Sequence, residues 1–559
     1  MIHRRTLLKS AALIMGATIL SRVTGLGRES TITGLLEVGV ATDAYYMALA
    51  IPDILRYLVL SGFLGAIFIP LFADVAARRG LADAKTMAGQ FLTLTVIIGT
   101  LATGVGMLLA PQFIALTQLI SPTQGTTPEM IQQAIVLTRI VFPVLLTTAL
   151  MGLLAGILNS LHDYHTPAWA PIWYNLVFIA GMVGIHLAAP RYVTAETMAV
   201  VTVAGAIVQV VVQFPALARQ GVHWRMPQFN DPLWRSFVTQ IPAAFIGYAA
   251  LVTNTFVDRA FAFGMEPVML TAQYLSIRVQ QLPVGVFTAT LVTALFPSVA
   301  QKLSLGRTDE AMEDLYLGLR MCGLTLLPCT VFLMVWSVPV IRLLFNHGEF
   351  RENPRALQET APALAAYATS LFTAAGVAFT TRTFFAIHDR RTPVVMGLSS
   401  ILLNYAADYL LSKTYNLRLV GIAYSSLIVT GFSFFGSLAI ISRGYPVIRR
   451  WPFRPETGKM VLLSLLYAAF AQGLAMLCNR LLPLIGPTNH LTPKLADLAY
   501  LTAMLAISVI FLLGVAALLR MEEIAVLRRI LRRRRSGGGT GANGDTKPTG
   551  TPPPPVGDF

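Results

Sequence analysis

Long apolar runs, separated by short polar stretches, recur along almost the whole chain. A helix needs about 20 mostly apolar residues to cross a bilayer, so the pattern predicts membrane-spanning helices rather than a barrel. Several of the fourteen expected spans are longer than this, which predicts tilt or extension beyond the bilayer. The spans are 7–35, 42–74, 87–119, 130–161, 167–189, 193–219, 235–263, 268–302, 311–345, 356–387, 393–413, 418–442, 458–484 and 494–520.

Composition agrees with this pattern. Of the 559 residues, 55% are hydrophobic and only 12% are charged, whereas soluble domains carry about 25% charged residues. The chain is therefore expected to be an all-α polytopic membrane protein. Its three cysteines, Cys322, Cys329 and Cys478, lie in apolar runs, which predicts packing rather than a disulfide framework or a metal site.

The basic residues are distributed unevenly between the loops. With a cytoplasmic N-terminus, the inner loops hold 18 Lys and Arg before the C-terminal tail, and the outer loops hold seven. This asymmetry predicts that both termini are cytoplasmic, and it explains the net charge of +15 without a nucleic-acid partner. Residues 521–559 begin with a basic run and continue as a Gly/Pro/Thr-rich tail that we expect to be disordered.

An internal repeat divides the apolar region. His162–Pro167 recurs as His388–Pro393 at an offset of 226 residues, and Phe68–Pro70 recurs as Leu295–Pro297 at an offset of 227. The repeat predicts two six-helix bundles, related by an axis along the membrane normal, around a central cavity. The expected parts are 1–226, 227–445, a pair of additional spans in 446–520, and the tail.

Charged residues cluster in the first two spans. Arg22, Arg28 and Glu29 lie in the first span, and Asp43 and Arg56 lie in the second. A charge at membrane depth costs several kcal/mol, so such residues predict a functional site. Nine basic residues remain when those of the loops, the span ends and the tail are set aside, and all nine are arginines within spans: Arg22, Arg28, Arg56, Arg139, Arg259, Arg278, Arg320, Arg342 and Arg382. The guanidinium group suits bidentate binding of phosphate.

Two simpler explanations of this cluster remain open. Residues 3–9 resemble a twin-arginine export signal, but no A-x-A cleavage site follows and further spans do. Snorkelling to the headgroups would account for Arg28 or Arg56 alone, but less well for three arginines together with Glu29.

Several motifs resemble the MurJ/MviN family of lipid II flippases, within the multidrug/oligosaccharidyl-lipid/polysaccharide exporter superfamily. The resemblance covers residues 10–520. The motifs are Ser21-Arg22-Val23-x-Gly25-x-x-Arg28, Ala41-Thr42-Asp43-Ala44, Pro52-x-x-x-Arg56, Gly65-Ala66-x-Phe68-Ile69-Pro70, Arg278-Val279-Gln280-Gln281-Leu282-Pro283-x-Gly285-Val286-Phe287 and His388-Asp389-x-x-Thr392-Pro393.

The resemblance implies a multi-pass transporter of the bacterial cytoplasmic membrane, not an enzyme, that works by alternating access. Its substrate would be lipid II, the undecaprenyl-pyrophosphate-linked peptidoglycan precursor for the cell wall. The resemblance also implies that the transporter is a monomer surrounded by membrane lipids. The polyprenyl tail of the substrate would lie in a groove formed by the last two helices. The family's cavity arginines fall on Arg22, Arg28, Arg56 and Arg278, and we place Glu29 and Asp43 in the same substrate site. The family usually has Asp at position 29 and Asn at position 53, where this chain has Glu29 and Asp53.

A second polar cluster is expected away from the arginines. Asn404 and Asp408 share one face of the eleventh span, and Asp258 lies in the seventh. Two carboxylates and an amide suit a hard monovalent cation. The resemblance implies Na⁺ as a coupling ion, with Ser426 as a further ligand. The alternatives are a network of hydrogen bonds that packs helices, or pairing of Asp258 with its neighbour Arg259.

Two other functions were weighed against the flippase. One is export of another lipid-linked oligosaccharide or of drugs, and an arginine-rich cavity disfavours cationic drugs. The other is a membrane enzyme that acts on lipid pyrophosphates. The sequence contains no P-loop, zinc-binding spacing or nucleophile elbow, which argues against an ATP-driven pump or a lipid hydrolase.

The topology can be tested by cysteine labelling. Single cysteines would be introduced at Ser536 and Arg351, in a background that lacks Cys322, Cys329 and Cys478. An impermeant reagent added outside intact cells is expected to label position 351 only. Labelling of position 536 but not of position 351 would contradict the fourteen-span topology.

Overall fold

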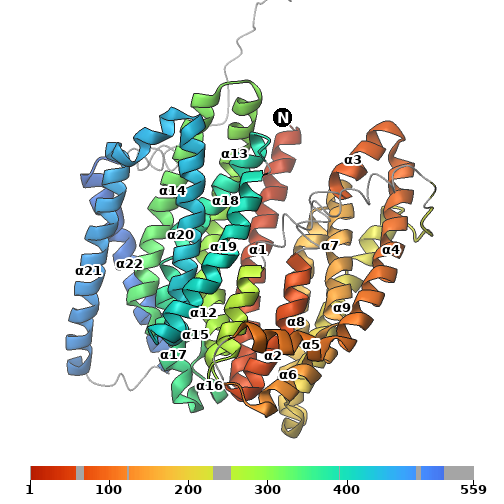
Figure 1. The fold of residues 1–559 in the computed structure, drawn as a ribbon, viewed down its shortest axis with the longest axis horizontal. Coiled ribbons are helices and arrows are strands. Elements are labelled where there is room, and N and C mark those ends of the chain that lie inside the picture. The colour runs from red at the N-terminus through yellow and green to blue at the C-terminus, as the bar shows by residue number, and fades with distance from the viewer. Residues whose placement is uncertain are drawn as a thin grey trace, which may run out of the picture.

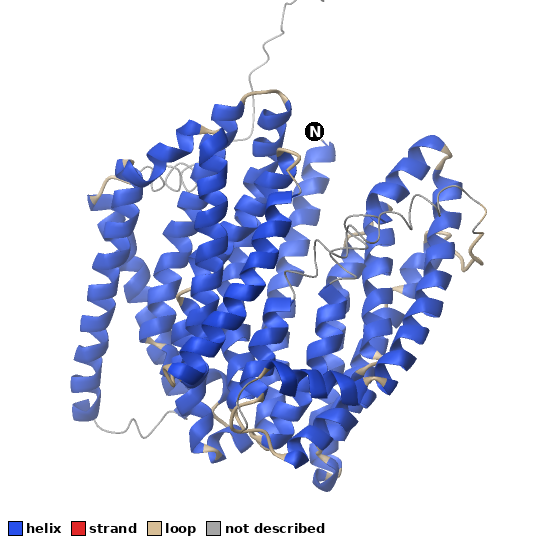
Figure 2. Cartoon of the chain, in the orientation of Figure 1, coloured by secondary structure: helices blue, strands red, loops and turns tan. Residues whose placement is uncertain are grey.

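The computed structural model describes residues 2–57, 68–121, 125–228, 230, 253–389, 391–485 and 493–521. Within these ranges the chain is helical and has no strand (Figure 2). The first half contains α1 (Ile2–Leu35), α2 (Val40–Tyr57), α3 (Ile69–Arg78), α4 (Leu81–Leu108), α5 (Ala110–Ile120), α6 (Pro128–Val141), α7 (Val144–Ser160), α8 (His165–Ala188), α9 (Ala195–Val211) and α10 (Phe214–Arg219).

The second half begins, in the described part, with a helical segment at 253–263. It is followed by α12 (Met269–Pro283), α13 (Ala289–Ser304), α14 (Thr308–Val335), α15 (Ser337–Phe345), α16 (Gly348–Glu352), α17 (Pro354–Ala368), α18 (Leu371–Ala386), α19 (Arg391–Asp408), α20 (Arg418–Gly444), α21 (Pro455–Ile485) and α22 (Pro493–Leu518). A π-helical turn, Val284–Thr288, joins α12 to α13, and another, Tyr409–Thr414, follows α19.

Ten helices in the described residues are long and apolar enough to cross a membrane, and α17 with α18, bent by 45°, gives an eleventh. Each of these coincides with an expected span. The other three expected spans are 7–35, 42–74 and 235–263. The first lies in α1, and the other two extend into residues outside the described ranges. The prediction of a polytopic all-helical protein is confirmed, while the count of fourteen stays a prediction.

The two copies of the repeated motif have the same local geometry. His162 and His388 adopt positive φ angles of 65° and 63°. Asp163 then accepts hydrogen bonds from the backbone N–H and hydroxyl of Thr166, and Asp389 accepts the same pair from Thr392. These bonds hold the pKa of Asp389 below its usual value. The two aspartates therefore cap α8 and α19, so the repeated motif has a structural role in the turn before each helix.

The two sequence halves meet at one end of the molecule. In Figure 1, α3 and α4 lie on one side, α13 and α14 lie on the other, and the helices approach each other at the end away from the N-terminus. There the Ser30 hydroxyl donates to the Leu344 carbonyl over 2.9 Å, and the Asn353 amide donates to the Val38 carbonyl over 2.7 Å. The Gly125 N–H donates to the Gly264 carbonyl over 2.9 Å. In the expected topology this end faces outward.

The close approach at this end depends on two glycines. Gly348 has a φ angle of +51°, and a Cβ added there would lie 2.0 Å from the Gly34 carbonyl oxygen. A Cβ on Gly34 would lie 2.8 Å from Nε2 of His347. Side chains at either position would therefore push α1 away from the α15–α16 turn.

The last two helices pack on the outside of the second half. α21 contacts α14, and α22 contacts α15; both lie at the left edge of Figure 1. Arg342 of α15 forms an ion pair with Asp497 of α22 at 3.7 Å. The expected tail groove in this pair stays a prediction.

Candidate functional site

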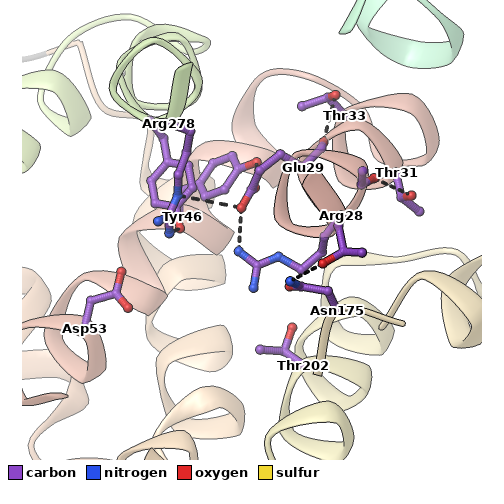
Figure 3. A network of polar contacts seen from close by, with 12 residues as sticks. Arg28, Glu29, Thr31, Thr33, Tyr46, Asp53, Asn175, Thr202 and Arg278 are labelled. Carbon is purple, nitrogen blue, oxygen red and sulfur yellow. Dashed lines mark hydrogen bonds and ion pairs between the residues drawn. The ribbon is translucent and has the colours of Figure 1, made fainter. Parts of the chain in front are cut away.

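A buried carboxylate on α1 is surrounded by hydrogen-bond donors from three helices. Glu29 is 1% exposed, and its Oε1 accepts from Nη2 of Arg28 at 2.5 Å. Nε of Arg278, on α12, lies 3.8 Å from the same oxygen. The Tyr46 hydroxyl, on α2, donates to Oε2 over 3.0 Å. Figure 3 shows Arg28, Tyr46 and Arg278 pointing toward Glu29.

Aromatic rings hold the two arginines in place. Tyr46 stacks on Tyr274, with ring centroids 4.1 Å apart. Arg278 donates to the Tyr274 hydroxyl, and its guanidinium carbon lies 4.5 Å from the Tyr274 ring centroid. The guanidinium of Arg28 lies 5.0 Å from the centroid of Tyr174, on α8. Cation–π contacts of this kind are worth about 0.5–2 kcal/mol each.

The charge around Glu29 is unbalanced. Two guanidinium groups share one carboxylate, so the cluster keeps an excess of positive charge. Nε of Arg28 is buried and has no hydrogen-bond partner in the described part of the chain. The Arg278 side chain is 29% exposed, against 2% for Glu29, so Arg278 is the more accessible of the two arginines. The arrangement can bind an anion with two phosphate groups.

The other two predicted arginines are placed less completely. Arg22 also lies on α1. Its guanidinium contacts the π-helical turn Val284–Thr288: a Cβ added to Gly285 of that turn would lie 2.6 Å from Nη2 of Arg22. Arg22 therefore reaches the second half of the chain next to the end of α12. Arg56 lies on α2, but its side chain is outside the described part of the structure.

Asp43 lies between α2 and the start of α12. It is fully buried. Its Oδ2 accepts from the Val268 N–H over 2.9 Å, and its Oδ1 accepts from the N–H of Thr271 over 2.8 Å and from the Thr271 hydroxyl. Asp43 therefore supplies the acceptors that the first turn of α12 lacks, and it ties α2 to α12. Its assignment to the substrate site stays a prediction.

Three of the four residues predicted for the cation cluster, Asp258, Asn404 and Asp408, lie in contact. The Asn404 amide donates to Oδ1 of Asp258 over 2.7 Å and to Oδ2 of Asp408 over 3.2 Å, and all three residues are buried. Oδ1 of Asp408 is buried without a partner in the described residues. The Ser426 hydroxyl lies 3.5 Å from the Ile422 carbonyl oxygen, and the hydroxyl of its neighbour Ser425 lies 3.5 Å from the Asn404 carbonyl oxygen.

The Glu29 cluster and the cation cluster lie next to each other, on residues that are adjacent in the sequence. Asp258 is followed by Arg259, and Gln273 is followed by Tyr274. The Gln273 amide donates to the Asp258 carbonyl over 3.1 Å, whereas the Arg259 guanidinium lies 5.5 Å from the Tyr274 ring centroid. Arg259 pairs with Asp53, with Nη2 and Oδ2 3.2 Å apart. Sequence reasoning counted Arg259 among the span arginines but missed this pairing and both tyrosines.

Comparison with known proteins gives a consistent result. The family model described as lipid II flippase MurJ matches residues 32–496. A probable lipid II flippase MurJ from Rhizobium tropici is 27% identical over 531 residues, which cover 94% of this chain and 97% of that protein. A lipid II flippase MurJ from Burkholderia cenocepacia is 27% identical over 414 residues, which cover 72% of this chain and 78% of that protein.

Solved structures share the fold. A structure titled lipid II flippase MurJ, inward closed conformation, has a TM-score of 0.72 at 18% identity and covers 92% of this chain and 100% of that one. An inward-facing multidrug resistance transporter of the MATE family has a TM-score of 0.60 at 16% identity, covering 78% of this chain and 98% of that one.

The structural role of Asp43 is testable. Asp43→Ala removes the acceptor for two backbone N–H groups and one hydroxyl in the interior, and each buried donor left unpaired costs about 1–3 kcal/mol. We expect a clear fall in the melting temperature of the purified protein. Asp74→Ala is the control, because Asp74 forms an exposed pair with Arg78 and such pairs contribute about 0–1 kcal/mol. Equal melting temperatures for parent and Asp43→Ala would contradict the role.

Proposed function

The chain belongs to the lipid II flippase MurJ family, and on that premise we propose that it moves lipid II from the inner to the outer leaflet of the bacterial cytoplasmic membrane. The observation that carries this proposal is the pair of arginines, Arg28 and Arg278, gathered on the buried Glu29 from opposite halves of the sequence. The cargo of such a site bears negative charge, and lipid II carries a pyrophosphate between its sugar and its lipid.

The chemistry of the cluster suits a pyrophosphate. Guanidinium groups form paired hydrogen bonds with phosphate oxygens, and these bonds are stronger in a partly desolvated site than in water. Because Arg28 comes from α1 and Arg278 from α12, a bound pyrophosphate would contact both sequence halves. A multidrug exporter of cationic compounds is less well supported, since the same arginines would repel its cargo.

We propose fourteen spans in two six-helix bundles, with α21 and α22 outside them and both termini in the cytoplasm. The hydrogen bonds between the halves at the end away from the N-terminus then close the outer side. In this state the headgroup enters from the inner leaflet, and release outside requires these contacts to break. Alternating access of this kind follows from rocking of the two bundles.

We propose Na⁺ as the coupling ion at Asp258, Asn404 and Asp408. The carboxylate oxygens of the two aspartates are brought together around one amide, and the unpartnered Oδ1 of Asp408 gives an oxygen free to bind a cation. The Ser426 hydroxyl is proposed as a further ligand. Hard monovalent cations prefer oxygen ligands of these types.

The pyrophosphate site can be tested by substitution. Arg28→Ala and Arg278→Ala each remove a charge-assisted contact of about 1.5–3 kcal/mol, so lipid II affinity should fall roughly ten- to hundred-fold. Lysine at either position should restore part of the loss, because the charge remains but the two-pronged geometry does not. Binding and flipping would be measured on purified variants reconstituted in liposomes.

Arg139→Ala supplies the matched control, because Arg139 is an exposed arginine on α6 that lies outside the cluster. It should bind and move lipid II like the parent. If folded, inserted Arg28→Ala and Arg278→Ala proteins also behave like the parent, the pyrophosphate site is placed wrongly.

The Na⁺ proposal predicts ligand-induced stabilisation. A ligand that binds only the folded protein raises its stability by RT ln(1 + [L]/Kd), so NaCl should raise the melting temperature above that in choline chloride at equal ionic strength. Asp258→Asn and Asp408→Asn should each abolish the difference. If the parent melts at the same temperature in both salts, the cluster binds no sodium and serves helix packing.

A further inference from the structure

A second ion pair joins the two sequence halves beside the Glu29 cluster. Nη2 of Arg259, on the helical segment 253–263, lies 3.2 Å from Oδ2 of Asp53, on α2. Both side chains are largely buried, at 11% and 18% exposure. Figure 3 shows Asp53 on the side of the cluster where Tyr46 and Arg278 lie.

Arg259 reaches the same aromatic ring that positions Arg278. Its guanidinium carbon lies 5.5 Å from the Tyr274 ring centroid, and that of Arg278 lies 4.5 Å from it. Tyr274 in turn stacks on Tyr46, which donates to Glu29. Arg259 is thus one aromatic side chain away from the residues that we assign to the pyrophosphate.

Arg259 also has an unused donor. Its Nη1 is buried and has no hydrogen-bond partner within the described residues. Leaving a buried charged donor unpaired is unfavourable, so the group gains most from a ligand that brings further acceptor oxygens. A pyrophosphate brings several such oxygens and at least two negative charges, whereas Asp53 brings one charge.

We propose that Arg259 is a further binding residue for the pyrophosphate of the substrate and that Asp53 restrains it in the ligand-free protein. On binding, the Arg259 guanidinium exchanges the Asp53 carboxylate for phosphate oxygens. The inference rests on the proposed function. Beyond that function, the inference states that Asp53 lowers substrate affinity, both by occupying Arg259 and by repelling the phosphates.

A purely structural ion pair would behave differently. If Asp53 and Arg259 only held α2 to segment 253–263, removing either charge would lower stability and would leave affinity equal or weaker. Competition predicts opposite signs for the two single variants. It also predicts that the effect of Asp53 depends on the presence of Arg259, which a double-mutant cycle measures directly.

The test is lipid II binding by the full-length protein in nanodiscs, compared among the parent, Asp53→Asn, Arg259→Gln and the double variant. We expect Asp53→Asn to bind about fivefold more tightly and Arg259→Gln about tenfold more weakly, as expected for charge-assisted contacts in a partly buried site. The double variant should match Arg259→Gln within about twofold, because the gain from Asp53→Asn requires Arg259.

The control is Glu313→Gln, which breaks a second ion pair between distant segments, Arg454–Glu313 at 2.5 Å, and should leave affinity unchanged. If Arg259→Gln does not accumulate, Arg259→Lys replaces it, and the gain from Asp53→Asn should shrink in that background. Weaker or unchanged binding by Asp53→Asn, or an equal gain with and without Arg259, overturns the inference. A parent protein that does not bind lipid II overturns the proposed function instead.

Discussion

The burial of the Glu29 carboxylate constrains the centre of this molecule. A charge in a low-dielectric interior is tolerated only with close, well-oriented donors, and Glu29 obtains them from Arg28, Tyr46 and Arg278, on three helices of both sequence halves. The two arginines and one glutamate together carry a net positive charge. The same contacts therefore explain why α1, α2 and α12 converge, and they are the reason we propose an anion site at the point of convergence.

The polar contacts between the halves at the end away from the N-terminus differ in number and burial. Asp43 caps α12 from α2 in a fully buried position, five residues after Val38, which accepts from Asn353. The bond from Ser30 on α1 to Leu344 on α15 is a single, partly buried contact. A transporter that opens alternately must break the contacts at its closed end, and the Asp43 cap, with several bonds to one helix start, costs more to break than a single hydrogen bond.

Sequence patterns predicted the helices and the arginines because both follow from the cost of polar groups in lipid. Long apolar runs specify spans, and charged residues inside them must find partners, so Arg28 and Glu29 could be grouped in advance. Arg278 joined them only through the resemblance to the family. The role of Asp43 could not, because it depends on contact with Thr271, 228 residues away. Tyr46 and Tyr274 also gave no signal, since aromatic residues are common in spans and only packing shows which of them hold a guanidinium.

We have proposed that two arginines held by one buried glutamate receive the pyrophosphate of lipid II. An experimental structure of the protein with lipid II bound tests this proposal. We predict phosphate oxygens at about 2.7–3.0 Å from guanidinium nitrogens of both Arg28 and Arg278, with Glu29 still bound to Tyr46. Phosphates bound elsewhere in the protein, with the contacts of Arg28 and Arg278 to Glu29 unchanged, would contradict it.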